Sequence, residues 1–314
     1  MYSMGYGWPP VGKIHAILSV AAVHRKEISR MTERRKARSP GRLYEGYVFD
    51  LDGTIYLGDE LLPGAERLIL KLREMGKRVV FLSNNPTKDP EMYAEKLTKL
   101  GLETPVSEIV NTVVTMTRWL RENHPDATVF PIAEEPLKNA LREAGIKMSE
   151  NPEEIDIVIA SYDRGFDYRK LQIAFDAIWF HGRAKLVTTN PDRYCPFPGG
   201  RGEPDAAAIV GAIEGCTGAK CEVNVGKPSP IMLQTIMDLM GLDAKDCVMS
   251  GDRLYTDIRM GLDAGMPSAV VLTGETTAES LAEEPEENVP EYILARIDHL
   301  IPAELREELG WRDD

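Results

Sequence analysis

The chain has 314 residues, a length at which about two domains are expected. Its hydrophobic share of 43% and charged share of 28% are those of a globular protein, which excludes a disordered chain, a fibrous repeat and a polytopic membrane protein. Residues 1–42 carry a net charge of +7, so the rest of the chain holds −20 of the overall −13. A body this acidic is a poor partner for nucleic acid or anionic lipid, and we expect neither.

The first segment, residues 1–42, is predicted to be a flexible or partly helical extension. Its apolar stretch at 14–23 is half of the ~20 residues that a membrane-spanning helix needs, and no small-residue cleavage site follows it. A translation start at Met31 and a short targeting role are the alternatives. The four cysteines form no Cys-x-x-Cys pair and are too few for a disulfide framework, which predicts a reducing, cytoplasmic compartment.

From residue 43 onward, short apolar runs alternate with helical patterns. Such runs are typical of a parallel sheet covered on both faces. In chain order, the core pattern has strands at 47–49, 78–82, 246–250 and 268–272 and helices at 66–74, 91–100 and from 230. A second set of strands and helices lies between the two halves of the core pattern. Its strands are predicted at 128–132, 155–160 and 185–189 and its helices at 135–144, 168–180 and 206–214. The tail is acidic and loop-like from 274 to 287, followed by a strand at 292–297 and a short helix.

We therefore predict an α/β fold, namely a Rossmann-like, doubly wound parallel sheet with an inserted α/β module. The core domain is assigned to residues 43–124 and 223–314, and the inserted module to residues 125–222.

Polar side chains follow the predicted core strands, and the carboxyl ends of parallel strands are where such sheets bind ligands. Their order along the chain therefore predicts a single site at one edge of the sheet. They are Asp50, Asp52 and Gly53 after the first strand, Ser83 and Asn84 after the second, Lys227 before the helix from 230, and Asp252 and Asp257 after the strand at 246–250.

This set of residue types suits phosphoryl transfer. Clustered carboxylates repel one another and favour a hard divalent cation, and Mg²⁺ takes one or two carboxylates together with phosphate and water. One carboxylate can be the nucleophile that forms an aspartyl-phosphate. Another, two residues on, can give a proton to the leaving alkoxide and later take one from water. A lysine and a serine can hold the non-bridging oxygens as charge develops.

Each motif alone has a simpler interpretation. Asp-x-Asp is common in turns, and a lone lysine is usually a solvated surface charge. The segment at Asp50 is no EF-hand loop, because its glycine comes fourth and it follows a strand; Lys227 is in no P-loop, because Pro228 replaces the required Ser or Thr. The order of the motifs at successive strand ends favours one shared site.

With these motifs the chain resembles the haloacid dehalogenase (HAD) superfamily of phosphatases, in the subclass typified by NagD and the 4-nitrophenylphosphatases. The resemblance covers nearly all of residues 43–300, and the insertion lies where this subclass carries a large α/β cap. Residues 1–42 have no counterpart in the family pattern. The matching segments are FDLDGTIYLGDELLPGA (49–65), FLSNNPTKD (81–89), VGKPSP (225–230) and GDRLYTDIRMGLDAGM (251–266).

The resemblance implies a role for each catalytic position. Asp50 would be the nucleophile and a Mg²⁺ ligand. Asp52 would be the general acid and base and would give its backbone carbonyl to the metal, and Asp252 would be a further metal ligand. Lys227 would steady the nucleophile and the transferring group. Because dehalogenases of the superfamily lack the second aspartate, Asp52 favours a phosphatase.

The resemblance also implies phosphate-binding and cap residues. Ser83, Asn84 and backbone N–H groups near Gly53 would bind the phosphoryl oxygens, while Asp257 would lie near the metal or the lysine. In the cap, a segment of sequence Thr-Asn-Pro-Asp matches a loop that faces the active site in similar proteins; an internal turn is the alternative. The candidate substrate contacts in this loop are Asn190, Asp192 and Arg193.

The leading prediction is a Mg²⁺-dependent phosphatase of small organic phosphomonoesters, such as a sugar phosphate, phosphoglycolate, a nucleotide or 4-nitrophenyl phosphate. The alternatives are a phosphomutase and a catalytically idle phosphate-binding protein. A mutase is disfavoured because mutases of the superfamily usually carry a helical cap, and an idle protein because every catalytic position holds the required residue type. The expected partner is a small phosphate ester; a homodimer is left open, and the substrate does not follow from the sequence.

Overall fold

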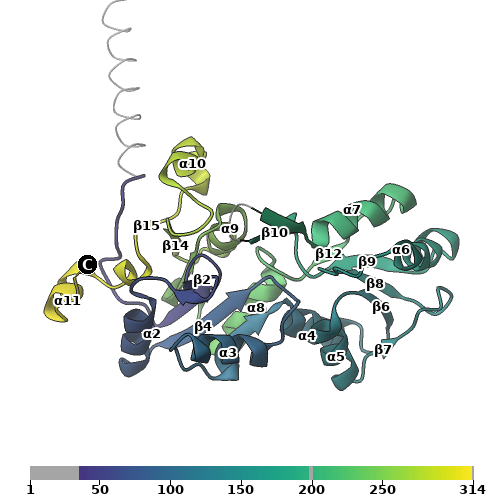
Figure 1. Ribbon diagram of the computed structural model, residues 1–314, viewed down its shortest axis with the longest axis horizontal. Coiled ribbons are helices and arrows are strands. Elements are labelled where there is room, and N and C mark those ends of the chain that lie inside the picture. The colour runs from purple at the N-terminus through teal and green to yellow at the C-terminus, as the bar shows by residue number, and fades with distance from the viewer. Residues whose placement is uncertain (1–34, 198–200, 313–314) are drawn as a thin grey trace, which may run out of the picture.

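The computed structural model describes residues 35–197 and 201–312, so the predictions for residues 1–34 lie outside the described part. The chain builds two α/β units side by side, each on its own parallel sheet (Figure 1). Within the described residues, no helix has the length and apolar character needed to cross a membrane. The predicted fold class, a doubly wound core with an inserted α/β cap, is confirmed.

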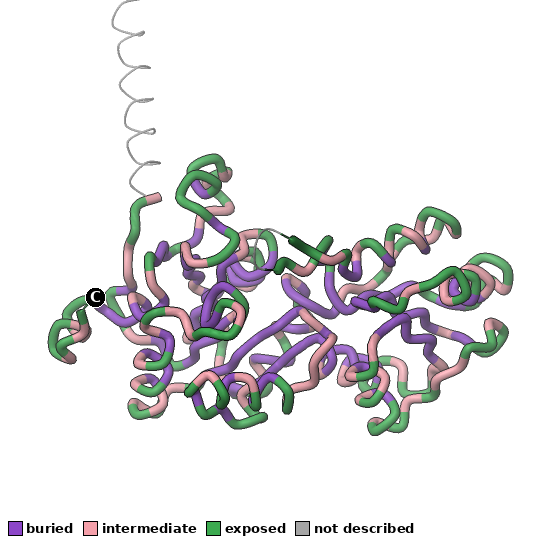
Figure 2. Tube along the Cα trace, viewed as in Figure 1, coloured by how far each residue is buried: buried purple, intermediate pink, exposed green. Residues whose placement is uncertain are grey.

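The core sheet has six parallel strands in the order β15-β14-β13-β1-β4-β5. The central strand β1 alternates between the two faces: Tyr47 and Phe49 pack in one apolar cluster and Val48 in another. Both faces are thus buried, and Figure 2 shows the strands of the core sheet as buried along most of their length. The core strands are β1 (Gly46–Asp50), β4 (Arg78–Ser83), β5 (Ile109–Asn111), β13 (Cys247–Gly251), β14 (Ser268–Val271) and β15 (Tyr292–Leu294).

Helices cover the core sheet on both faces, as the sequence predicts. The helices α2 (Ala65–Glu74) and α3 (Pro90–Lys99) pack with Tyr47 and Phe49, whereas α8 (Pro230–Met240) and α9 (Arg259–Ala264) pack with Val48. The smaller core elements are β2 (Tyr56–Leu57), β3 (Glu60–Leu61), the π-helical segment η4 (Leu254–Ile258), the 3₁₀ turns η1 (Val106–Glu108), η3 (Ala244–Asp246), η5 (Glu286–Asn288) and η6 (Ile297–Leu300), and α11 (Ala303–Glu308).

The inserted unit, hereafter the cap, has a five-stranded parallel sheet in the order β12-β9-β8-β6-β7. The last strand, β12, lies just past the expected boundary at 222, and the helix α4, which packs on this sheet, lies just before the expected boundary at 125; both boundaries stay predictions. Side chains from α4 and α5 pack on one face of this sheet and side chains from α6 and α7 on the other. The cap elements are α4 (Thr112–Asn123), β6 (Thr128–Ile132), α5 (Glu135–Glu143), β7 (Lys147–Met148), β8 (Ile157–Ala160), α6 (Tyr168–Phe175) with η2 (Asp176–Phe180), β9 (Lys185–Thr188), α7 (Ala206–Thr217) and β12 (Val223–Asn224).

Several segments depart from the sequence prediction. The strand β5 and the helix α4 were not predicted. The acidic tail at 274–287, expected to be a loop, contains the helix α10 (Ala278–Glu283). Its first turn is closed by a capping box, in which the Ser280 N–H donates to Thr277 Oγ1 and the Thr277 N–H donates to Ser280 Oγ. The Gly- and Pro-rich sequence after β9 forms an antiparallel hairpin of β10 (Tyr194–Phe197) and β11 (Arg201–Pro204).

Candidate active site

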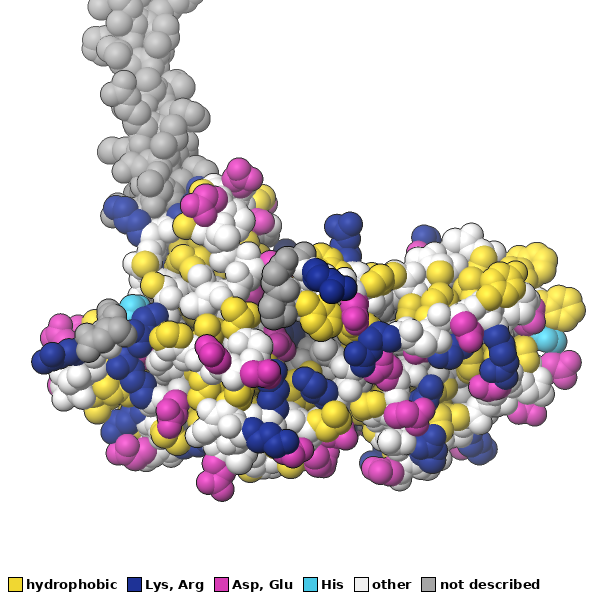
Figure 3. All heavy atoms as spheres, in the orientation of Figure 1, with side chains coloured by type: hydrophobic (Ala, Val, Ile, Leu, Met, Phe, Trp, Pro, Cys, Tyr) yellow, Lys and Arg dark blue, Asp and Glu magenta, His cyan; other side chains and the backbone are white. Residues whose placement is uncertain are grey.

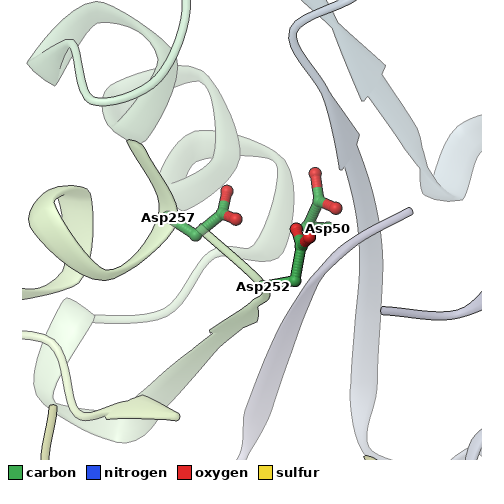
Figure 4. Close-up of side chains that lie close together, drawn as sticks. All are labelled: Asp50, Asp252 and Asp257. Carbon is green, nitrogen blue, oxygen red and sulfur yellow. The ribbon is translucent and has the colours of Figure 1, made fainter. Parts of the chain in front are cut away.

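Three carboxylates meet at the carboxyl edge of the core sheet. Asp50 ends β1, Asp252 directly follows the neighbouring strand β13, and Asp257 lies in η4. One oxygen of each lies within 4.8 Å of the others, as the grouped side chains in Figure 4 illustrate. Asp252 and Asp257 are buried, and Asp50 is nearly so. The parallel pairing of β1 with β13 therefore creates the cluster that the sequence predicts.

Lys227 supplies a cation to this cluster. Its Nζ lies 2.5 Å from Asp50 Oδ1 and 2.7 Å from Asp257 Oδ1, and its side chain is 3% exposed. Burial lowers the pKa of Lys227, but the charges of Asp257 and Asp50 raise this pKa by more, so the buried group is an ammonium. One ammonium among three carboxylates leaves an excess of negative charge.

Burial and this excess of negative charge raise the pKa values of Asp50 and Asp252. Burial raises the pKa of Asp50 well above its usual range, Lys227 opposes the rise, and Asp257 and Asp252 add to it. Burial, and next the charge of Asp257, raise the pKa of Asp252 to about 7. Carboxyl groups that resist ionisation in this way are stabilised as carboxylates by a bound cation.

The residues present fit a hard divalent cation. Asp252 Oδ1 is buried and has no hydrogen-bond partner among the described residues, while its Oδ2 accepts the Glu275 N–H at 2.6 Å. A buried carboxylate oxygen without a donor calls for a ligand, and a donor set made of oxygens suits Mg²⁺. The cluster is thus compatible with the predicted metal.

The carboxylates of Asp252 and Asp257 lie where any side chain on three neighbouring glycines would lie. A Cβ on Gly274 would lie 2.0 Å from Asp252 Oδ2, and a Cβ on Gly53 would lie 2.6 Å from the same atom. On the other side, a Cβ on Gly251 would lie 2.3 Å from the Asp257 carboxyl carbon. Any side chain at these positions would displace a carboxylate of the cluster. Gly274 is the first residue of the acidic tail, which the sequence predicts to be a loop.

We expect Mg²⁺ affinity to depend on pH in a defined direction. Because the pKa of Asp252 is about 7 without metal and that of Asp50 is also raised, protons compete with the cation below neutral pH. Affinity should fall by at least about tenfold for each pH unit below 7, as expected when binding displaces at least one proton. Isothermal titration with MgCl₂ between pH 5 and 8 measures this slope; an affinity that is flat below pH 7 would contradict it.

The predicted acid and base, Asp52, lies two residues beyond Asp50 and is exposed. Its Oδ2 accepts the hydroxyl of Tyr56 at 3.2 Å. The N–H of Gly53 donates to the carbonyl of Tyr56 at 2.8 Å, so this amide is already engaged within its own turn. The predicted phosphate contact through Gly53 itself therefore has no free N–H here, and the structure gives the glycine another function, its close approach to Asp252.

The predicted phosphate-binding pair, Ser83 at the end of β4 and Asn84 directly after it, makes two different sets of contacts. The hydroxyl of Ser83 lies 2.9 Å from the Tyr93 hydroxyl, and either atom can be the donor. Asn84 instead binds the backbone of Lys227: its Oδ1 accepts the Lys227 N–H at 2.7 Å, and its Nδ2 donates to the Lys227 carbonyl at 3.2 Å. The Ser83 hydroxyl also accepts the Asn85 N–H at 3.2 Å, so both side chains make contacts within the protein, and their binding of phosphate stays a prediction.

The predicted cap residues reach the core to different extents. Asn190 is buried and donates through Nδ2 to the backbone carbonyl of Asn84 at 2.9 Å. Asp192 accepts from Asn84 Nδ2 at 2.9 Å. Arg193, by contrast, is exposed. The Thr-Asn-Pro-Asp segment therefore does meet the active-site edge, through two of its three predicted residues.

Two residues that contact the cap were not predicted, although both lie in a quoted motif. Arg253 and Tyr255 follow Asp252 and face the cap: Arg253 Nη1 lies 3.4 Å from Asp192 Oδ1, and the Tyr255 hydroxyl donates to the same atom at 3.3 Å. The signal that could have found them is their place in the sequence, directly after the strand-end carboxylate Asp252. Cys195 on β10 accepts weakly from Asn85 Nδ2 at 3.8 Å; burial, together with nearby acidic groups, raises the pKa of its thiol to about 11, which leaves it a poor nucleophile.

Comparisons with known proteins agree with this geometry. Residues 47–147 match the family described as haloacid dehalogenase-like hydrolase, and residues 224–300 match the one described as HAD-hydrolase-like. The Bacillus subtilis protein named sugar-phosphatase AraL is 38% identical over 254 residues, which cover 80% of this chain and 90% of that protein. The chain belongs to the haloacid dehalogenase-like hydrolases. The acid sugar phosphatase of Staphylococcus epidermidis is 35% identical over 239 residues, or 76% of this chain and 90% of that protein.

Solved structures place the chain in the same group of HAD-like hydrolases. The 4-nitrophenylphosphatase of Thermotoga maritima superposes with a TM-score of 0.77 at 33% identity, over 82% of this chain and 96% of that one. The p-nitrophenyl phosphatase of Archaeoglobus fulgidus gives a TM-score of 0.76 at 32% identity, over 82% and 98% of the two chains. The resemblance to the NagD and 4-nitrophenylphosphatase subclass is thereby confirmed, as is the predicted enzyme class, a phosphatase.

Proposed function

We propose that this HAD-like phosphatase is Mg²⁺-dependent and hydrolyses compact sugar phosphates through an aspartyl-phosphate on Asp50. The observation that carries the proposal is the convergence of Asp50, Asp252 and Asp257 within 4.8 Å around the buried ammonium of Lys227. Three separate segments of the chain would then supply the nucleophile, the metal ligands and the positive charge that faces the phosphate.

In the first step an oxygen of Asp50 attacks the phosphorus, and the bond from phosphorus to the leaving oxygen breaks. Asp52, exposed at the mouth of the site, gives its proton to that oxygen, which departs as an alcohol. Lys227 and the Ser83 hydroxyl hold the non-bridging oxygens as their charge redistributes. When bound, Mg²⁺ neutralises charge on the phosphoryl oxygens and aligns them with the nucleophile.

The second step returns the enzyme to its starting state. Asp52, now a carboxylate, takes a proton from a water molecule whose oxygen attacks the phosphorus. The bond between phosphorus and Asp50 breaks, and inorganic phosphate is released. Asp50, Asp252 and the backbone carbonyl of Asp52 would hold the metal throughout, with Asp257 fixing Lys227 at 2.7 Å.

Two observations support small esters as substrates. The curated relatives described above are named sugar phosphatases, and the cap contacts the core directly around the site through Asn190, Asp192 and Cys195. A cap seated this closely favours compact esters. Acidic and basic side chains are interspersed over the face seen in Figure 3, so the anionic substrate would be held by the local donors rather than by a basic surface.

Steady-state phosphate release tests the proposal, with 4-nitrophenyl phosphate and a panel of sugar phosphates. We expect turnover in Mg²⁺, its loss in excess EDTA, and its return when Mg²⁺ is restored. Absence of phosphate release from every ester, with clean Mg²⁺ binding, would contradict the proposal. Transfer of the phosphoryl group to a second sugar without phosphate release would identify a mutase.

The location and assembly of the protein stay proposals. All four cysteines are free, which supports the predicted cytoplasmic compartment. A homodimer stays a prediction; the outer helices of the cap expose Tyr168, Trp179 and Phe180, residue types that are common in protein interfaces.

A further inference from the structure

The cap residue Asp192 is engaged by the core through both of its carboxylate oxygens. Its Oδ2 accepts from Asn84 Nδ2 at 2.9 Å, while its Oδ1 lies 3.3 Å from the Tyr255 hydroxyl and 3.4 Å from Arg253 Nη1. The Asp192 side chain is only 3% exposed. A buried carboxylate that meets three donors from the opposite domain is built to join the two domains.

The three donors lie on both sides of the nucleophile. Asn84 follows β4, and Arg253 and Tyr255 follow β13; both strands pair with β1, which ends at Asp50. The single carboxylate of Asp192 therefore spans the strand end that carries the nucleophile. Its contacts hold the cap loop to the core on both sides of the strand that ends at Asp50.

Asn84 connects this contact to the catalytic lysine. An amide Nδ2 has two hydrogens, so Asn84 can donate to Asp192 and also to the Lys227 carbonyl at 3.2 Å. Its Oδ1 accepts the Lys227 N–H at 2.7 Å. Lys227 then reaches Asp50 with its Nζ at 2.5 Å. The chain of contacts runs from the cap to the nucleophile without a gap.

The residues at this junction are closely packed. A Cβ on Gly226, the residue before Lys227, would lie 2.5 Å from the carbonyl oxygen of Thr189 in the cap and 2.8 Å from Asn84 Oδ1. The cap loop, the Asn84 amide and the lysine loop thus touch one another. A shift of the cap loop would be passed on to Asn84 and Lys227 rather than absorbed.

We propose that Asp192 is a positioning residue that couples the seating of the cap to the placement of Lys227 through Asn84. The Asp192 carboxylate orients the Asn84 amide, the amide holds the Lys227 backbone on both sides, and the ammonium is thereby kept on Asp50. Asp192 is then no substrate ligand, in contrast to the expectation from the sequence. The inference rests on the proposed function only for its kinetic readout.

The kinetic arm compares wild type, Asp192→Ala and the matched control Asp126→Ala, which removes an exposed carboxylate of the cap. We expect Asp192→Ala to lower kcat by about 10- to 100-fold, the loss typical of a small misplacement of catalytic groups. The loss should be equal for 4-nitrophenyl phosphate and ribose 5-phosphate, with KM unchanged for both. A rise in KM confined to the sugar phosphate would mean a substrate contact and would overturn the inference.

The double-mutant arm asks whether the effect passes through Asn84. In an Asn84→Ala background, Asp192→Ala should cost less than about twofold in kcat, because the intermediate group is already absent. The same fold-loss in both backgrounds would overturn the inference. Thermal unfolding of each variant identifies any loss that comes from a smaller folded fraction.

The exchange arm needs no turnover. Because the Lys227 N–H is held by Asn84, Asp192→Ala should speed hydrogen–deuterium exchange in a peptide covering residues 226–229, and Asp126→Ala should not. Unchanged exchange would overturn the coupling even in an active enzyme. A wild-type protein that hydrolyses no ester would refute the proposed function, while this arm would still decide the role of Asp192.

Discussion

Replacing Asp50 with Asn is expected to reduce phosphate release by about 10⁴-fold or more, the scale of loss seen when a nucleophile is removed. The amide nearly matches the carboxylate in size but is a poor nucleophile, so no aspartyl-phosphate can form. Initial rates with 4-nitrophenyl phosphate and a sugar phosphate in saturating Mg²⁺ measure the effect. Because Lys227 stays beside the substituted group, phosphate esters should still bind.

The matched control is Asp59→Asn, which changes an exposed aspartate in the turn between β2 and β3. It should keep the wild-type rate. Acid-quenched protein incubated with a ³²P-labelled ester should carry label in wild type and none in Asp50→Asn. Turnover in Asp50→Asn above about 1% of wild type, far more than loss of a nucleophile permits, would show that another group attacks the phosphorus.

Replacing Lys227 with Met should damage both stability and activity. The substitution leaves Asp50 and Asp257 buried without their ammonium, and breaking a buried ion pair on one side costs about 3–5 kcal/mol. Turnover should fall by about 10²- to 10³-fold, the loss expected for one donor to a developing oxyanion. Urea unfolding and steady-state kinetics measure the two effects.

Addition of Mg²⁺ should separate the effect of Lys227→Met on stability from its effect on turnover. A bound cation replaces part of the missing positive charge, so the stability deficit of Lys227→Met should shrink in saturating Mg²⁺ while its turnover stays low. The control is Lys185→Met, because Lys185 forms an exposed pair with Glu222 at 3.2 Å that contributes about 1 kcal/mol at most. A variant at Lys227 as stable as this control would contradict the ion cluster described here.

Local pattern was enough for the strands that carry the catalytic residues. β1, β4 and β13 are continuous apolar runs because both of their faces are buried. Such runs can be recognised in the sequence without knowing which strands pair with them. The polar residues at their ends then belong to one edge of a parallel sheet. The edge strand β5 and the helix α10 escaped prediction because three and six residues give too short a pattern, although the Thr277–Ser280 pair was a visible start signal for α10. The 12-residue helix α4 was also missed, although Asn111 offered an N-cap signal at its start.

The sequence by itself therefore determined the α/β class, the insertion of a second sheet, and the three carboxylates and the lysine that lie together at the edge of the core sheet. Only the tertiary structure decided what Gly274, Asn84 and Asp192 do. Their partners lie far away in the chain: Asn84 binds residues 108 and 143 positions later, and Gly274 makes room for a carboxylate that follows another strand. Contacts of this kind depend on how segments far apart in the chain pack against one another, within the core and between the core and the cap, and no periodicity or motif within one segment encodes that packing.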